Sequence, residues 1–226
     1  MRAGCETTRP ALLLSAGGAL RYVGTYSQLP MIRNAARKVL DRGAVRPRDV
    51  AELGVSRTRL KRMTRSGELE RVGRGLYVPT NAAITGHHSL VEAAARVPRG
   101  IVCLISALRF HEIGTQSPHE VWLAVDRKAR KPVVDWPRLR VARFSGAALT
   151  FGIEVHHLEG VRVRITSRER TVADCFKYRN KVGLDVALEA LREYLRARER
   201  SVDALVDAAR ICRVSRVMQP YLEAMT

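Results

Sequence analysis

Helical spacing of apolar residues dominates the chain between residues 31 and 67. The first predicted helix carries its apolar residues at three- and four-residue intervals: Ile32, Ala35, Ala36, Val39 and Leu40. Gly43 is placed to end this helix. A second, short helix is expected from Pro47, a residue well suited to a first helical turn, with Val50, Ala51 and Leu53 as its apolar face. Gly54 then interrupts the pattern.

A third helix is predicted to begin after Ser56, a good N-cap residue, and to end at Gly67. At about 100° per residue, one side of this helix collects Leu60, Met63 and Thr64. The opposite side consists of Thr58, Arg62 and Arg65, and Arg59 and Lys61 flank it. The residues expected to face outward are Thr58, Lys61, Arg62 and Arg65. Two helices joined by a short turn containing glycine are typical of a helix-turn-helix.

A β-hairpin is predicted directly after the third helix. Two short β-prone runs lie on either side of Gly73, Arg74 and Gly75, and no helix follows as a phosphate-binding loop would require. The hairpin resembles the wing of a winged helix, with Arg71 and Arg74 at its tip. A plain helical domain with a basic, solvated face is the alternative.

The remaining chain predicts a small sheet followed by a helical tail. Helices are expected over 89–97, 106–111, 184–196, 202–209 and 214–225, with another beginning after Ser167. Strands are expected over 121–125, 139–144, 153–157 and 161–165, whereas 101–104 fits a strand or a helix start. The fold class is therefore α+β.

The net charge of the chain indicates what kind of molecule it binds. The chain has 226 residues and a formal net charge of +18, so it offers either one large domain or two small ones. The charge is densest over residues 31–80, where 13 basic and 5 acidic residues occur. A polyanion is the expected partner, nucleic acid first and an anionic membrane surface second.

Residues 1–30 continue none of the patterns described above. Two arginines and a broken apolar stretch resemble a signal peptide only faintly. We expect residues 1–30 to be a poorly ordered extension or the product of a mis-assigned start, with Met31 as the true beginning. The four cysteines (Cys5, Cys103, Cys175 and Cys212) lack zinc-site spacing and indicate a reducing cytoplasm. No apolar run is long enough for a membrane span.

Four segments resemble the AbiEi family, whose members are antitoxins and autorepressors of bacterial type IV toxin–antitoxin (abortive infection) operons. They are the segment 50–79 with its Arg71–Tyr77 hairpin, the segments 104–108 and 118–122, and the segment 167–174. The resemblance covers residues 31–226. It implies a winged helix-turn-helix domain over 31–80 and an antitoxin domain over 85–226.

The resemblance also implies partners. Such proteins bind inverted repeats in their own promoter as double-stranded DNA, and they counter a nucleotidyltransferase-like toxin without forming a stable complex. In this sequence the expected DNA-binding residues are Ser56, Arg57, Thr58, Arg59, Lys61, Arg62, Arg65, Arg71 and Arg74. No catalytic residue, metal or cofactor is expected, and no membrane association.

The sequence contains incomplete motifs of two classes of enzyme. A nucleotidyltransferase centre needs two carboxylates two residues apart on a strand, and Glu120 and Asp126 are six apart. A restriction-type nuclease remains an alternative, with Asp126 and Lys128 in its Asp-x-Lys element and Glu112 as the earlier acid. A winged-helix regulator without a toxin is the third possibility.

The histidines and tryptophans suggest no further site. No HExxH motif occurs, and His88 with Glu92 supplies only one pair of metal ligands, so the six histidines are expected to be ordinary polar residues. Trp122 and Trp136 are predicted to be core or rim aromatics rather than platforms for base stacking.

Overall fold

The computed structural model describes residues 38–39, 45–73, 75–80 and 85–225. The predicted extension over 1–30 lies outside these residues, and so does most of the predicted first helix. Of that helix, Lys38 and Val39 are described; both are helical, and Val39 is fully buried.

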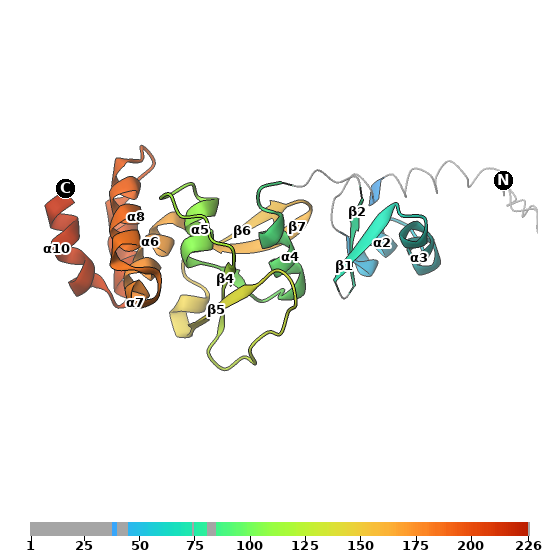
Figure 1. Ribbon diagram of the computed structural model, residues 1–226, viewed down its shortest axis with the longest axis horizontal. Helices are drawn as coiled ribbons and strands as arrows, with labels where there is room; N and C mark the ends of the chain where they lie inside the picture. Colours follow the sequence, from blue (N-terminus) through green and yellow to red (C-terminus); the bar gives the residue numbers. More distant parts are fainter. Residues whose placement is uncertain (1–37, 40–44, 74, 81–84, 226) are drawn as a thin grey trace, which may run out of the picture.

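Within residues 45–80, apart from the undescribed residue 74, helices α2 (Pro47–Glu52) and α3 (Arg57–Arg65) are followed by a hairpin in the predicted order (Figure 1). The strands of the hairpin are β1 (Leu69–Gly73) and β2 (Leu76–Pro79). The core of this N-terminal domain consists of Val39, Val45, Val50, Val55, Leu60, Met63 and Leu69. Ala51 is exposed, so the apolar face of α2 depends on Val50 and the half-buried Leu53 rather than on all three predicted residues.

A backbone bridge joins the start of this domain to its hairpin. Val45 donates its N–H to the Tyr77 carbonyl at 2.8 Å, and Tyr77 donates in return at 3.0 Å. The antiparallel strands β1 and β2 have an irregular register between Glu70 and Gly73. Their two-residue connection consists of residues 74 and 75, and Gly75 has a φ of 69°, a value that L-residues seldom adopt.

The second domain is α+β, as predicted. Its strands are β3 (Ile101–Val102), β4 (Val121–Asp126), β5 (Leu139–Phe144), β6 (Ile153–Leu158) and β7 (Val161–Thr166). Its helices are α4 (His88–Arg96), α5 (Leu104–Phe110), the 3₁₀ turn η2 (Gly146–Leu149), α6 (Arg168–Lys177), α7 (Arg179–Val182), α8 (Leu184–Arg196), α9 (Val202–Cys212) and α10 (Ser215–Met225).

The sheet has the order β5-β4-β3-β7-β6 and mixes strand directions. The pairs β4/β5 and β3/β7 are parallel, whereas β3/β4 and β6/β7 are antiparallel. The run 101–104, which fitted a strand or a helix start, is divided between both. Ile101 and Val102 form β3, and α5 begins at Leu104 with a φ of 51°.

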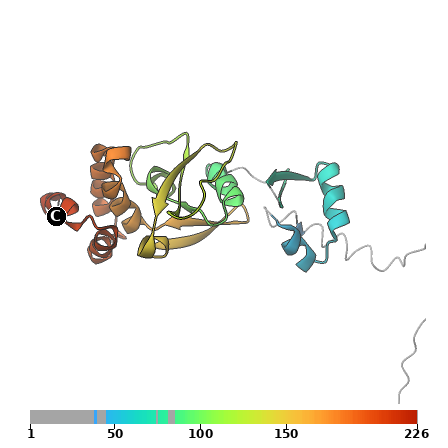
Figure 2. The same ribbon diagram turned by 90° about the horizontal axis from the view of Figure 1, so that it is seen from below.

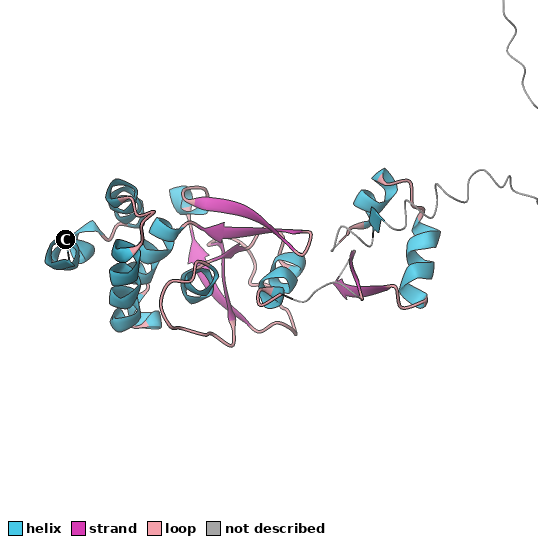
Figure 3. Cartoon of the chain, turned by 90° about the horizontal axis from the view of Figure 1, so that it is seen from above, coloured by secondary structure: helices cyan, strands magenta, loops and turns pink. Residues whose placement is uncertain are grey.

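Alternation along the strands divides the apolar residues between two cores. Trp122 and Ala124 of β4 pack with the helical tail, whereas Val121 and Leu123 pack with α4. Figure 3 shows the tail helices gathered on one side of the strands, and Figure 2 shows the N-terminal domain at the opposite end. Val78 of β2 belongs to the α4 core, so the two domains share one apolar cluster.

Candidate nucleic-acid interface

The helix α3 is fixed in place by its cap and by two buried side chains. The Ser56 hydroxyl accepts the Arg59 backbone N–H at 3.2 Å, which confirms the predicted N-cap. Leu60 and Met63 are buried, and the Thr64 hydroxyl donates to the Leu60 carbonyl at 3.0 Å. Gly67, with a φ of 78°, follows the end of the helix. The third helix therefore has the predicted limits and inner face.

The outer face of α3 is cationic. The predicted site residues exposed on it are Ser56, Arg57, Thr58, Lys61, Arg62 and Arg65. None of its exposed arginines and lysines forms an ion pair with another described residue. Arg57 occupies the first turn, where the helix dipole favours an acidic residue and none is present. The stability of the helix does not require these positive charges. They are suited to binding an anionic partner.

Arg59 departs from the prediction. Its side chain is only half exposed, and its Nε atom is buried without a hydrogen-bond partner in the described part of the chain. The helical position of Arg59 lies between the inner and outer faces, so its aliphatic stem covers the domain while its neighbours project into solvent. Arg59 is consequently a border residue of the interface.

The hairpin arginines lie at different places. Arg71 is exposed but belongs to β1, so it lies along the side of the hairpin and not at its tip as predicted. The tip of the hairpin lies between Gly73 and Leu76, which pair with each other. Arg74 is outside the described residues. The site that the structure assembles is therefore the outer face of α3, with Arg71 on the adjacent strand.

The residues of the nuclease alternative adopt a turn. Asp126 ends β4, and its Oδ1 accepts the Lys128 backbone N–H at 2.8 Å. Lys128 follows the strand rather than lying on it, and both side chains are exposed. Glu112 is exposed at a φ of 57° just after α5. Within the described ranges, no group of three or more histidine, cysteine or acidic side chains is arranged to hold a metal ion.

The histidines take structural partners. His88 Nδ1 lies 2.8 Å from Glu159 Oε2, so it does not pair with Glu92 as a ligand set would require. Burial lowers the pKa of His111, whose Nε2 lies 2.7 Å from the Thr166 carbonyl oxygen and donates to it, since a carbonyl only accepts. Cys103, Cys175 and Cys212 are free and buried. Burial raises the pKa of each thiol, which keeps it protonated and unreactive.

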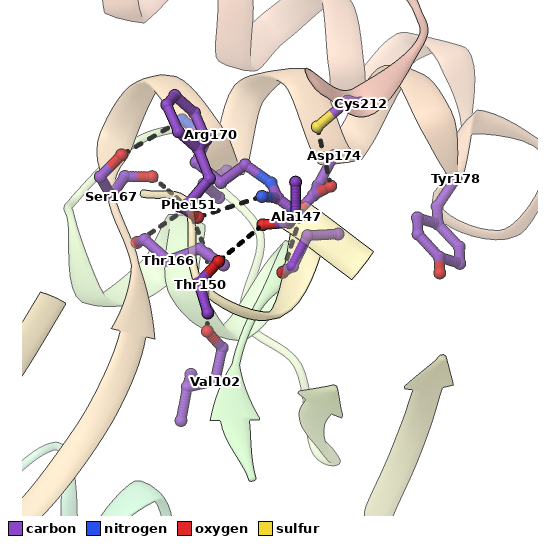
Figure 4. Close-up of polar contacts among 12 residues, drawn as sticks. Val102, Ala147, Thr150, Phe151, Thr166, Ser167, Arg170, Asp174, Tyr178 and Cys212 are labelled. Carbon is purple, nitrogen blue, oxygen red and sulfur yellow. Dashed lines mark hydrogen bonds and ion pairs between the residues drawn. The ribbon is translucent and has the colours of Figure 1, made fainter. Parts of the chain in front are cut away.

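A buried ion pair in α6 was not predicted from the sequence. Arg170 Nε donates to Asp174 Oδ2 at 2.9 Å, and both side chains are completely buried (Figure 4). The Arg170 guanidinium also donates to the carbonyls of Phe151 and Ala148, and Cys212 Sγ donates to Asp174 Oδ1 at 3.2 Å. The pair joins α6 to η2 and α9. An arginine four residues before an aspartate, with Val172, Ala173, Cys175 and Phe176 around the aspartate, is the signal that could have revealed it.

Glu159 links the start of the second domain to its sheet. Its side chain is 4% exposed and accepts the Thr85 N–H at 2.9 Å and the Thr85 hydroxyl at 2.8 Å, besides contacting His88. Burial opposes ionisation of this carboxyl, but the hydrogen bonds from His88 and Thr85 outweigh it and lower its pKa. We call these three residues the Glu159 clamp; they fix the point at which the second domain begins.

Comparison with known proteins finds a family that the N-terminal domain resembles. Residues 34–80 match the family described as "Transcriptional regulator, AbiEi antitoxin". Among solved structures, this chain matches the crystal structure of the RV2827C protein from Mycobacterium tuberculosis, with 16% sequence identity and a TM-score of 0.47 over 95% of this chain and 86% of that chain. No curated protein matches the sequence.

Among the described residues, no helix has the length and apolarity to cross a lipid bilayer. The matched segment contains the whole of α2, α3 and the hairpin, which are the elements that build the cationic face. Residues 34–80 are thus the part of this chain that is similar to the AbiEi family of antitoxins and transcriptional regulators.

Proposed function

We propose that this protein is a sequence-specific repressor that binds inverted repeats of double-stranded DNA in its own promoter, and that it is also an antitoxin. The observation that carries the proposal is the outer face of α3, where the exposed cations Lys61, Arg62 and Arg65 point away from buried Leu60 and Met63. Arg57 is exposed in the first turn of the same helix. The family match over residues 34–80 supports the same activity. On this proposal α2, α3 and the hairpin act as a winged helix-turn-helix.

The proposed contacts follow from the reach of each side chain. Arg62 and Arg65 lie on the centre of the outer face, where a guanidinium can pair bidentately with a guanine in the major groove. Arg57 and Lys61 flank that centre and suit phosphate oxygens. Arg71 on β1 and Arg74 are placed in the sequence for the adjacent backbone or minor groove.

The second domain is proposed to carry the antitoxin activity against a nucleotidyltransferase-like toxin in the cytoplasm, without a stable complex between the two proteins. The proposed role needs no catalysis by this chain and no cofactor. Asp126, the acid of the nuclease alternative, serves as a turn residue through its bond to the Lys128 N–H.

Promoter binding is tested with the double variant Arg62→Ala/Arg65→Ala. Loss of two bidentate base contacts should weaken specific binding by about 1–3 kcal/mol for each arginine, while non-specific binding falls less. Arg198→Ala/Arg216→Ala removes two exposed arginines of the helical tail and is the matched control. Electrophoretic mobility shifts with promoter DNA and a scrambled duplex give both affinities, and unchanged specific affinity in the first variant would remove α3 as the reading helix.

Antitoxin action is tested separately by co-expression with the toxin encoded in the neighbouring reading frame. The wild-type protein and Asp126→Asn should restore growth equally. If only Asp126→Asn failed while its thermal stability stayed normal, the nuclease alternative would gain support. If no neighbouring frame encoded a nucleotidyltransferase-like protein, the regulator without a toxin would be favoured.

A further inference from the structure

The connection between β4 and β5 is the most basic surface segment of the second domain. It forms a long loop at the lower edge of that domain in Figure 1, and with β5 it spans residues 126–143. This stretch contains two acidic residues, Asp126 and Asp135. Its basic residues, all exposed, are Arg127, Lys128, Arg130, Lys131, Arg138, Arg140 and Arg143. We call residues 127–138 the basic loop.

These cations are not neutralised by the fold. None of the seven forms an ion pair with any residue in the described ranges. Arg140 lies over the Trp122 ring at 4.5 Å, and Arg143 donates to the carbonyls of Asp126 and Ala129. Within the part of the chain that the structure describes, the side chains of the five cations of the basic loop itself have no such contact. Their charge is therefore available to an external anion.

The basic loop also contains an exposed aromatic residue, Trp136. Trp136 is 58% exposed, in contrast to Trp122, which is 4% exposed and belongs to the core. Trp122 is thus the core aromatic of the two, and Trp136 does not lie in the core. Pro137 is buried, and the Arg138 carbonyl accepts the Val121 N–H at 2.8 Å, so the chain beside Trp136 is fixed to the sheet.

From this juxtaposition we propose that the basic loop is a binding site for single-stranded nucleic acid, with the Trp136 indole stacking on an unpaired base and the surrounding cations contacting its phosphates. An exposed indole offers a flat face that every base can cover, and adjacent arginines and lysines follow the backbone. Duplex DNA keeps its base faces stacked inside, so it would use the cations but leave the indole exposed. The exposed indole is what favours a single strand.

The other partners of such a surface fit it less well. Apart from Trp136, the large apolar side chain exposed on the loop is Val133, so the apolar area is small for anchoring in a bilayer. The loop is also not an amphipathic helix, which is the usual surface-binding element. An acidic protein would be attracted by the cations but has no particular need of the indole. Membranes and proteins are therefore outcomes of the test.

The chain contains two tryptophans, which makes fluorescence a direct test. Full-length protein is titrated with oligo(dT) and with oligo(U), each of roughly 15 nucleotides, at physiological ionic strength. We expect quenching of the exposed Trp136 emission by a single strand, and comparing the two probes shows whether DNA or RNA is preferred. For variants that lack the indole, affinity is measured by the anisotropy of a dye-labelled oligonucleotide. Trp136→Ala should weaken binding roughly tenfold, whereas Trp136→Phe keeps an aromatic face and should lose much less.

The cations are tested by the salt dependence of binding. Lys131→Ala/Arg138→Ala should reduce the slope of log affinity against log salt by about 1.4, since each phosphate contact to a single strand contributes about 0.7. Arg198→Ala/Arg216→Ala, the matched pair of exposed cations from the tail, should leave the slope unchanged. Because all four residues are exposed, thermal melting should be the same in both variants and the wild type.

Several results would overturn the proposal. One is unchanged oligonucleotide affinity in Trp136→Ala, and another is an affinity lost in Arg62→Ala/Arg65→Ala, which would place the single strand on α3. Equal affinity for a duplex without quenching would reduce the loop to a phosphate surface. Emission changes with phosphatidylglycerol vesicles but not with oligonucleotides would identify a membrane site. The site does not depend on promoter binding, and the α3 variant separates failure of one proposal from failure of the other.

Discussion

At the scale of single residues, the buried pair Arg170–Asp174 is the most consequential polar contact. Both charges have left water completely, and the hydrogen bonds to Phe151, Ala148 and Cys212 satisfy the remaining polar atoms. Asp174→Asn removes one charge and leaves the other buried without compensation. We expect it to lower the free energy of unfolding by about 3–5 kcal/mol, measured by chemical denaturation.

The control for this prediction is an exposed pair. Arg210 and Asp207 lie 3.0 Å apart on the surface of α9, so Asp207→Asn should cost less than about 1 kcal/mol. The double variant Arg170→Met/Asp174→Leu removes both buried charges and should be less destabilised than Asp174→Asn. Equal losses in Asp174→Asn and Asp207→Asn would show that the buried pair contributes no more than a surface one.

The pH response of the fold should depend on His111. Burial lowers its pKa below the ordinary value of 6.5, so the folded state resists a proton that the unfolded state accepts. This histidine has no effect on stability above that value, and it lowers the free energy of unfolding as the pH falls from 6.5 towards the folded pKa. Unfolding curves between neutral and mildly acidic pH should therefore lose less stability in His111→Asn than in the wild type. His157→Gln, at an exposed position, should behave like the wild type.

At the scale of elements, the N-cap of α3 can be separated from its DNA contact. Ser56→Ala loses the bond to the Arg59 N–H and should destabilise the N-terminal domain by about 1 kcal/mol. Ser56→Asp keeps an acceptor and adds a charge that the helix dipole favours, so stability should be retained while promoter binding weakens against the phosphates. Thermal melts and mobility shifts measure the two effects.

A second cap gives the comparison. Ser201 caps α9 in the other domain by accepting the Ala204 N–H at 3.2 Å, so Ser201→Ala should cost similar stability and leave promoter affinity unchanged. If Ser56→Asp bound the promoter as tightly as the wild type, the start of α3 would not approach a phosphate.

Most elements of this protein could be predicted from local pattern. The expected helix 184–196 and strand 139–144 have the observed limits, and Ser167 caps α6 as its position indicated. Such features depend on neighbours in sequence: alternation, helical spacing and a hydroxyl before the first turn. The inner and outer faces of α3 were predictable for the same reason.

Features created by distant contacts could not be predicted. The order β5-β4-β3-β7-β6 depends on which strands meet, and alternation does not specify that. Arg170 lies three residues after the N-cap Ser167, the position of a capping box, yet its side chain pairs with Asp174 in the protein interior. This pairing depends on the burial of α6 by distant parts of the chain, which local pattern does not specify. The exposure of Trp136 likewise follows from the path of a loop, whereas composition suggests that a tryptophan is buried.

At the scale of the whole molecule, the second domain should fold without the first. Its two cores take all their buried residues from 85–226 except Val78. We expect a fragment of residues 85–226 to unfold cooperatively, at a somewhat lower temperature than the full chain because the Val78 contact is lost. Circular dichroism checks the transition. A fragment without a cooperative transition would show that the N-terminal domain is part of the folding unit.

The Glu159 clamp sets how far apart the two domains can act. It holds Thr85 at the turn between β6 and β7, and Thr80 is the last residue of the N-terminal domain described before it. Five virtual bonds between these residues reach at most about 18 Å. The clamp therefore makes a short tether, and a promoter held by α3 would meet the second domain at an effective concentration on the order of millimolar. If α3 holds the promoter, a molecule bound by the second domain would be brought close to that same promoter.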